Sequence, residues 1–171
     1  MNPTQNLILI GPMGSGKSAV GRALARELHR DFFDSDDVIE ERTGVDIPYI
    51  FEKEGEDGFR LREAKVIDEL TNMDGIVLAT GGGAVVRDEN RSCLGARGFV
   101  VYLKTSVDQQ LKRTNRGRER PLLSQVDDRR ERLDTLMRNR EPLYLEIADL
   151  IVATDGRKVQ AVARDILDRL P

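Results

Sequence analysis

The chain is poor in the residues that build disulfide frameworks and zinc sites. Its 171 residues include one cysteine, Cys93, and one histidine, His29. A single cysteine excludes an internal disulfide framework, and one cysteine with one histidine cannot supply a Cys/His zinc site. We expect structural roles for both residues, since His29 lies at the end of a predicted helix and Cys93 has no predicted partner.

The net charge is small and the apolar runs are short. The sequence has 27 Lys and Arg against 30 Asp and Glu, for a formal net charge of −3, which argues against nucleic acid as the main partner. Apolar runs such as residues 99–103 are only strand-sized, so no membrane span is predicted. Residues 1–5 lead directly into a strand without a basic segment and apolar h-region, so no secretory signal is expected.

What the chain does contain is enough apolar material for one core. Hydrophobic residues make up 39% and charged residues 33% of the sequence, which is typical of a folded chain and not of a disordered one. The length fits one domain. We therefore expect a single domain over residues 1–171, soluble and cytoplasmic, and a monomer.

Short apolar runs alternate with amphipathic segments along the whole sequence. The strand candidates are residues 7–10, 31–33, 76–79, 99–103 and 150–152. The helix candidates are residues 17–28, 36–42, 47–53, 59–70, 106–113 and 158–170, and the Arg-Glu-Pro at 140–142 is expected to interrupt a further helix. The strands are apolar throughout, so helices should cover both faces of a parallel α/β sheet. Ligands bind beyond the carboxyl ends of such strands.

The strongest motif follows the first strand. Residues 11–18 read G-P-M-G-S-G-K-S, which matches G-x-x-x-x-G-K-[ST] between a strand and a helix. Its glycines let backbone N–H groups turn toward a phosphate, Lys17 can reach the β- and γ-phosphates, and the Ser18 hydroxyl can bind Mg²⁺. An ordinary glycine-rich turn is the alternative, and it does not explain the Lys-Ser pair. The predicted ATP-binding residues here are Gly14, Ser15, Gly16, Lys17 and Ser18.

Acidic residues close the second strand. Asp34 and Asp36 can flank the crevice, one near a hydrated Mg²⁺ and the other near an acceptor hydroxyl. The alternative is a solvated helix N-terminus where acids complement the dipole, and for Asp37 we prefer that interpretation.

Glycines and arginines complete the expected crevice. The run at residues 81–83 has no side chains to pack, so it suits close approach of a ligand to the backbone, with a flexible turn as the alternative. Arg60 and Arg140 are surface candidates individually. Two guanidinium groups in one crevice would bind a carboxylate bidentately.

A basic segment follows the helix that ends near Arg113. Residues 113–123 lack apolar periodicity, so a solvated loop is one interpretation. In a phosphoryl-transfer enzyme such a segment suits a lid that closes over ATP and brings an arginine to the transferring group.

Together these motifs resemble the shikimate kinase family, especially its bacterial single-domain members. The resemblance runs from about residue 6 to 170, nearly the full length. It depends on the phosphate loop and on five further motifs: Asp-Ser-Asp at 34–36, Phe-Arg at 59–60, Thr-Gly-Gly-Gly at 80–83, Arg-Pro-Leu-Leu at 120–123 and Arg-Glu-Pro-Leu-Tyr at 140–144. The phosphate loop is shared by many families, but the combination in this order is specific.

The family implies a nucleoside-monophosphate-kinase-like, three-layer α/β/α fold. Its five-stranded parallel sheet is accompanied by a lid, here about residues 113–125, and a helical substrate-binding region, here about 34–62. By resemblance, shikimate is held by Asp36, Arg60, Gly82, Gly83 and Arg140.

The resemblance also assigns the catalytic and nucleotide-binding residues. The catalytic residues are Lys17, Asp36 as candidate base, and Arg120 as the lid arginine that reaches the phosphates. Arg113 is expected to border the adenine, Arg157 belongs to a more variable adenine-side loop, and Ser18 and Asp34 are expected to hold Mg²⁺. Phe51 and Phe59 match pocket aromatics, with a core role as the alternative.

The implied reaction is transfer of the ATP γ-phosphoryl group to the 3-hydroxyl of shikimate. The rivals are a kinase of the same fold acting on gluconate or a nucleotide, and a non-catalytic phosphate-loop module that senses nucleotide.

Overall fold

The computed structural model describes residues 1–114 and 123–171. It describes the side chains of all these residues except 123–127. Its centre is a five-stranded sheet in the order β2-β3-β1-β4-β5, in which every neighbouring pair is parallel. The strands are β1 (Asn6–Ile10), β2 (Phe32–Asp34), β3 (Val77–Ala79), β4 (Gly98–Lys104) and β5 (Leu150–Ala153). The α/β class and the five strands predicted from the sequence are confirmed.

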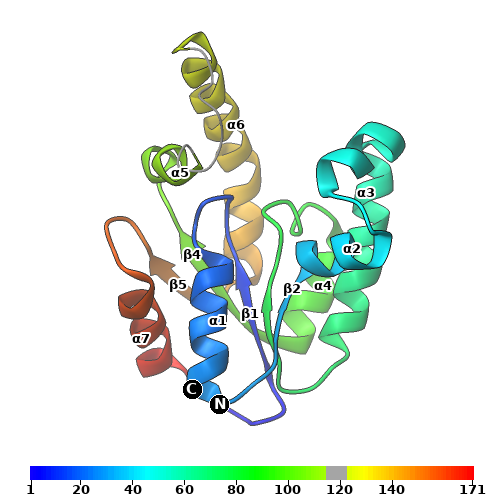
Figure 1. The fold of residues 1–171 in the computed structure, drawn as a ribbon. Helices are drawn as coiled ribbons and strands as arrows, with labels where there is room; N and C mark the ends of the chain where they lie inside the picture. Colours follow the sequence, from blue (N-terminus) through cyan, green and yellow to red (C-terminus); the bar gives the residue numbers. More distant parts are fainter. Residues whose placement is uncertain (115–122) are drawn as a thin grey trace.

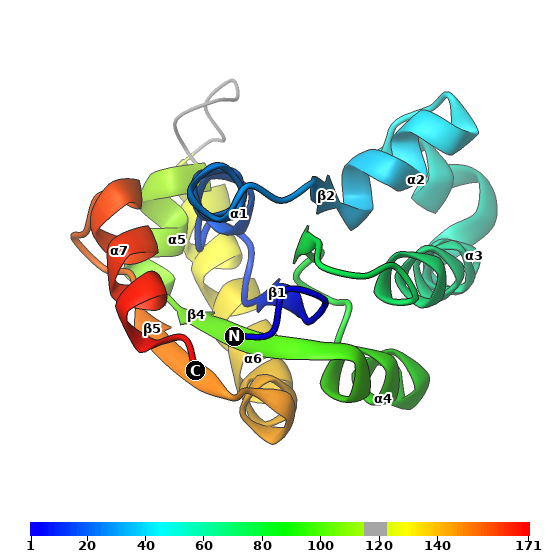
Figure 2. The same cartoon turned by 90° about the horizontal axis from the view of Figure 1, so that it is seen from below.

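Helices cover both faces of this sheet (Figures 1 and 2). They are α1 (Lys17–Leu28), α2 (Ser35–Thr43), α3 (Ile47–Thr71), α4 (Asp88–Arg97), α5 (Val107–Thr114), α6 (Leu123–Ile147) and α7 (Val159–Arg169). Buried residues of α1 and α7 pack on one face of the sheet, and those of α3, α4 and α6 pack on the other. None of the helices in the described part of the chain is long and apolar enough to cross a membrane.

The uninterrupted apolar strands explain this layering. Along β1, Leu7 and Leu9 belong to the core shared with α1 and α7, while Ile8 and Ile10 belong to the opposite core. A strand buried on both faces needs apolar residues at every position. The edge strand β5 departs from this pattern, because Ile151 is 45% exposed.

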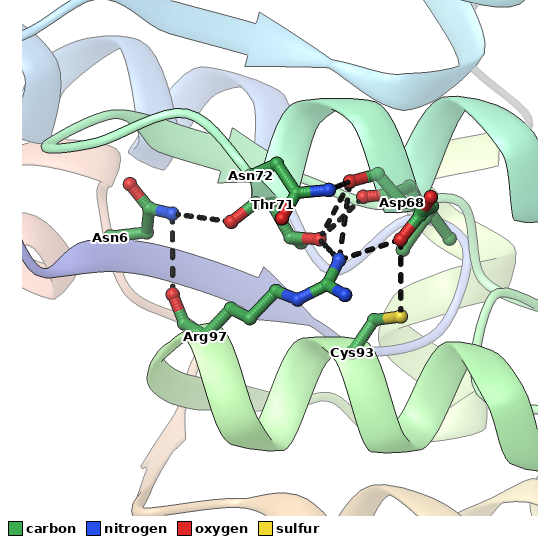
Figure 3. Close-up of polar contacts among 7 residues, drawn as sticks. Asn6, Asp68, Thr71, Asn72, Cys93 and Arg97 are labelled. Carbon is green, nitrogen blue, oxygen red and sulfur yellow. Dashed lines mark hydrogen bonds and ion pairs between the residues drawn. The ribbon is translucent and has the colours of Figure 1, made fainter.

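A polar cluster fastens the beginning of β1 to α3 and α4 (Figure 3). The Asn6 side chain donates to the carbonyl oxygens of Thr71 and Arg97, each at 3.2 Å. Arg97 pairs with Asp68 at 2.7 Å, and the Cys93 sulfur lies 3.8 Å from the same carboxylate. Burial raises the pKa of the Cys93 thiol. Cys93 therefore lies in a structural cluster at the edge of the sheet opposite the phosphate loop.

The structure tests two predicted helix boundaries. The break expected between the helices at residues 47–53 and 59–70 is present as a kink in α3 at Gly55, whose φ of 73° and ψ of 179° are not helical. The interruption predicted at Pro142 is wrong, because this residue lies inside α6. A proline in a helix removes one backbone hydrogen bond, a cost that tertiary packing of the flanking residues can offset.

The two long helices frame the carboxyl edge of the sheet. In Figure 1, α3 and α6 both extend past this edge, beyond the loop that joins β1 to α1.

Candidate active site

The loop between β1 and α1 has the backbone of a phosphate cradle. Gly11, Gly14 and Gly16 have φ values of 149°, 78° and 88°, which residues with a side chain rarely adopt. A Cβ on Gly11 would also lie 2.7 Å from the carbonyl oxygen of Leu103. The loop ends at the N-terminus of α1, which carries the positive end of the helix dipole.

Lys17 folds back over this loop. Its Nζ donates to the carbonyl oxygens of Gly11 at 2.7 Å and Pro12 at 2.9 Å. Burial lowers the pKa of Lys17 to about 8, with Arg140 adding to the effect and Asp36 and Asp34 opposing it. The ammonium is thus held where negative charge would stabilise it, as expected of a residue that meets a phosphate.

Ser18 and Asp34 form the second feature of the loop. The Ser18 hydroxyl donates to Oδ2 of Asp34. The other oxygen of Asp34 accepts from the backbone N–H groups of Asp36 at 2.9 Å and Asp37 at 3.3 Å, so Asp34 also caps α2. The exposed Asp37 faces Arg22 at 3.6 Å, in agreement with its predicted solvated role.

The side-chain oxygens of Ser18 and Asp34 suit Mg²⁺ better than a metal that needs three or more protein ligands. The described residues contain no group of three or more His, Cys, Asp or Glu side chains placed to hold a metal ion. Mg²⁺ usually takes one or two protein oxygens and completes its shell with water and substrate phosphates. Ser18 and Asp34 provide that kind of partial site.

Asp36 is an acid in a strongly perturbed environment. Its Oδ1 is buried and has no hydrogen-bond partner within residues 1–114 and 123–171. Burial raises the pKa of Asp36 to about 7; Asp34 and Glu63 add to this, whereas Lys17 and Arg60 oppose it. A buried acid that titrates near neutrality is suited to accept a proton.

The glycine run after β3 brings the remaining side chains together. A Cβ on Gly81 would lie 2.8 Å from Oδ1 of Asp36. A Cβ on Gly82 would lie 3.6 Å from Nη1 of Arg140, and one on Gly83 would collide with Nη2 of Arg60. The predicted acceptor residues therefore meet around a backbone that has no side chains of its own.

Glu63 belongs to this site and was not predicted. It is fully buried, and its Oε1 accepts from Nη1 of Arg60 at 2.8 Å. Its Oε2 has no partner in the described structure. Burial raises the pKa of Glu63, and Arg60 opposes the rise. The i,i+3 spacing to Arg60 on one helix was the signal that could have found it.

Tyr144 is the second residue that sequence reasoning assigned no role. It is buried on α6, and its hydroxyl donates to the carbonyl oxygen of Gly82 at 2.5 Å. Its ring stacks on Tyr102 with centroids 5.0 Å apart. Its place one turn after Arg140, at i+4, puts it on the same helix face, which is the signal that was overlooked.

The nucleotide side has a cavity of about 370 Å³ beside the phosphate loop. Arg113 reaches it and donates to the carbonyl oxygens of Gly14 at 2.9 Å and Thr154 at 3.2 Å. Arg157 also lines the cavity, but its guanidinium pairs with Asp165 at 2.9 Å. Arg120 lies outside the described residues.

The two predicted pocket aromatics differ in exposure. Phe59 is buried and Phe51 is 38% exposed, with ring centroids 4.9 Å apart. Phe59 belongs to the core on the α3 face of the sheet, whereas Phe51 does not.

A phosphate loop facing a buried acid and a pair of arginines, across the carboxyl edge of a parallel sheet, defines a phosphate-loop kinase with a small anionic acceptor. The profile of the family "Shikimate kinase" matches residues 13–171. The chain belongs to the shikimate kinase family, whose members are ATP-dependent kinases.

Individual relatives and structures agree with this assignment. Shikimate kinase of Vibrio cholerae is 56% identical over 170 residues, covering 99% of this chain and 97% of the relative. The structure of shikimate kinase from Acinetobacter baumannii in complex with shikimate superimposes with a TM-score of 0.90 at 48% identity, covering 98% and 96% of the two chains. A gluconokinase from Sinorhizobium meliloti reaches 0.62 at 19% identity, covering 98% and 92%, and shares the fold alone.

Proposed function

We propose that this chain carries out the reaction of its family, the transfer of the γ-phosphoryl group of ATP to the 3-hydroxyl of shikimate. The products are shikimate 3-phosphate and ADP, in a step of aromatic amino-acid biosynthesis. The observation that carries the proposal is the meeting of Asp36, Arg60 and Arg140 around residues 81–83, beside the phosphate loop. A carboxylated polyol needs cations to bind its carboxylate and hydrogen-bond acceptors to bind its hydroxyl groups.

On the acceptor side, Arg60 and Arg140 bind the carboxylate, and Asp36 binds ring hydroxyls. The backbone of Gly82 and Gly83 lies against the ring. This assignment is supported by the burial of Arg60, which is 9% exposed and already faces a carboxylate, that of Glu63. A guanidinium that is fixed before binding loses less entropy when the substrate arrives.

On the donor side, the phosphates lie on residues 14–18 and the adenine in the cavity near Arg113. Lys17 leaves the carbonyl oxygens of its own loop to meet the β- and γ-phosphates. Arg157 is proposed as an adenine-side contact. Arg120 and the lid of about residues 113–125 are proposed from the motif, and residues 115–122 lie outside the described structure.

Ser18 and Asp34 would hold Mg²⁺, Ser18 directly and Asp34 through water. Their support is the oxygen chemistry of the pair and their place at the end of the phosphate loop. When bound, the ion would neutralise part of the phosphate charge.

The chemical step is an in-line displacement. The 3-hydroxyl oxygen forms a bond to the γ-phosphorus while the bond between that phosphorus and the β,γ-bridging oxygen breaks, and ADP leaves. The hydroxyl proton goes to the carboxylate of Asp36. Lys17 and Arg120 stabilise the charge on the transferring group, so positioning and electrostatics supply most of the catalysis.

We propose that the enzyme is a monomer and that it acts in the cytoplasm. Residues 34–62 serve as the substrate-binding region within one domain of residues 1–171. Neither nucleic acid nor a membrane is part of the proposal.

The direct test is an ADP-release assay with shikimate, gluconate and nucleoside monophosphates as separate acceptors. We expect turnover with shikimate and at most background release with the others. Preferred turnover of gluconate or a nucleotide would assign another acceptor. No turnover with any acceptor would favour a nucleotide-sensing module.

Substituting Arg60 by lysine tests the carboxylate contact. Arg60→Lys keeps the charge but loses the planar pair of donors, so we expect the KM for shikimate to rise on the order of 10- to 100-fold. The KM for ATP should hardly change. Steady-state kinetics that vary each substrate in turn measure both values.

The matched control is Arg62, which lies two residues after Arg60 on α3. Its side chain is exposed and pairs with Glu54 at 2.7 Å. Arg62→Lys should leave both KM values unchanged. An unchanged shikimate KM in folded Arg60→Lys would remove Arg60 from the site.

A further inference from the structure

The hydroxyl of Tyr144 is bonded to the backbone on which the acceptor is proposed to lie. Tyr144 has no exposed surface, and its Oη donates to the Gly82 carbonyl oxygen at 2.5 Å. The two residues are far apart in sequence, on α6 and on the loop after β3. This bond therefore links the glycine run to the helix that carries Arg140.

Gly82 lies close to both the phosphate loop and Arg140. A Cβ at this position would lie 3.3 Å from the backbone nitrogen of Met13 in the phosphate loop and 3.6 Å from Nη1 of Arg140. Gly82 thus lies between the donor loop and one of the proposed carboxylate ligands. A shift of its carbonyl would change the distance between the two halves of the site.

The ring of Tyr144 is itself held in place. It stacks on Tyr102 with an interplanar angle of 22°, and Tyr102 pairs with Ile10, the last residue before the phosphate loop. Burial raises the pKa of Tyr144 to about 12, while the neighbouring Arg140 opposes the rise. The hydroxyl therefore remains a hydrogen-bond donor throughout the neutral range.

We propose that Tyr144 is a positioning residue of the acceptor site. By holding the Gly82 carbonyl, its hydroxyl keeps the backbone of residues 82–83 and the guanidinium of Arg140 in register with the phosphate loop. The acceptor then binds with its hydroxyl aligned to the γ-phosphorus. This inference rests on the proposed function, because it takes shikimate as the acceptor.

Tyr144→Phe removes the hydroxyl and keeps the stacked ring. We expect the KM for shikimate to rise roughly threefold to tenfold, the range set by the loss of one neutral hydrogen bond. The KM for ATP should stay within about twofold, and kcat should fall by less than the shikimate KM rises. A purely structural role would not separate the two KM values in this way.

Tyr102→Phe is the matched control. Tyr102 is equally buried and lies in the same stack, but its hydroxyl has no hydrogen-bond partner in residues 1–114 and 123–171. We expect this variant to keep both KM values. Equal effects of the two substitutions, or an unchanged shikimate KM in Tyr144→Phe, would overturn the inference while leaving the proposed function intact.

Amide hydrogen exchange of the ligand-free proteins tests the positioning without turnover. Residues 81–84 should exchange faster in Tyr144→Phe than in wild type or Tyr102→Phe, with β1 unchanged. If the wild type does not phosphorylate shikimate, the proposed function fails and this comparison alone decides the inference. A Tyr144→Phe protein that does not fold contradicts it, because a positioning role predicts a folded variant.

Discussion

Lys17→Ala should lower kcat on the order of 10²- to 10³-fold or more and leave the protein folded. Lys17 is proposed to meet the transferring phosphoryl group, and removal of one preorganised donor to developing charge typically has an effect of this size. In the described structure its Nζ donates hydrogen bonds of 2.7–3.3 Å to atoms of Gly11, Pro12 and Ser15, all in its own loop. Steady-state kinetics and thermal unfolding measure the two halves of the prediction.

The pKa of Lys17 predicts how stability should respond to pH. Its value in the folded protein, about 8, lies below the ordinary 10.5, so the folded state binds fewer protons than the unfolded state between these values. The buried Lys17 ammonium therefore lowers the free energy of unfolding by its full amount below pH 8 and has no such effect above pH 10.5. We expect the stability of Lys17→Ala relative to wild type to be greatest near pH 7 and to decline between pH 8 and 10.5.

Lys65→Ala is the control for this experiment. Lys65 is an exposed residue of α3, and its removal should change neither kcat nor the pH dependence. A folded Lys17→Ala protein with nearly normal kcat would refute the role of Lys17 in phosphoryl transfer.

The phosphate loop shows how far the sequence alone can reach. Its residues are contiguous, so residues 11–18 and the flanking strand and helix were sufficient to predict both the structure and the position of Lys17. The layers were predictable for a similar reason, since runs such as residues 7–10 must be buried on both sides. Each of these features depends on local pattern.

The acceptor site is assembled from distant segments, which local pattern does not bring together. Arg60 and Arg140 were candidates from their motifs, but their approach to residues 82 and 83 depends on how α3 and α6 cross the sheet edge. Glu63 and Tyr144 were missed because a buried glutamate and a buried tyrosine look like ordinary helix residues in a sequence. Their roles depend on which groups their polar atoms contact in the folded protein.

At Pro142 the local sequence leads to a wrong prediction. The residue predicts a helix break by its own chemistry, yet α6 continues through it to Ile147. Both Leu143 and Tyr144, directly after it, pack against the core on the α3 face of the sheet. Tertiary packing therefore prevails over local preference at this position.

Asp36→Asn should reduce kcat on the order of 10²- to 10⁴-fold, the range typical for loss of a general base. The substitution keeps the shape of the side chain and removes its charge. Nucleotide affinity should change little, because Asp36 lies beside Gly81 and near Glu63, on the acceptor side. If ATP affinity falls as far as kcat, Asp36 belongs to the nucleotide site instead.

Asp37→Asn provides the control, since the neighbouring side chain is exposed and pairs with Arg22 at 3.6 Å. Its kcat and its affinities should stay close to those of the wild type. A fall in Asp37→Asn comparable to that in Asp36→Asn would attribute the effect to the N-terminus of α2 as a whole.

The pH dependence of Asp36→Asn tests whether the ionised carboxylate of Asp36 is the form that supports turnover. The pKa of Asp36 in the folded protein is about 7, so the fraction of carboxylate rises as the pH increases through 7. Wild-type kcat/KM for shikimate should rise over the same interval. In Asp36→Asn the residual activity should lack this acidic limb. A variant that keeps the limb would assign the titration to another group, with Glu63 as the nearest alternative.

Stability gives an independent measurement of the same group. The folded pKa of about 7 lies above the ordinary 3.8, so between these values the folded protein binds the proton that the unfolded chain has lost. The contribution of Asp36 to stability therefore falls as the pH rises from about 4 to 7 and stays low above that. Unfolding of Asp36→Asn and wild type should diverge across this interval, with the variant the more stable at pH 8. Parallel stability curves would mean that burial does not raise the pKa of Asp36, and the case for Asp36 as a base would lose its physical ground.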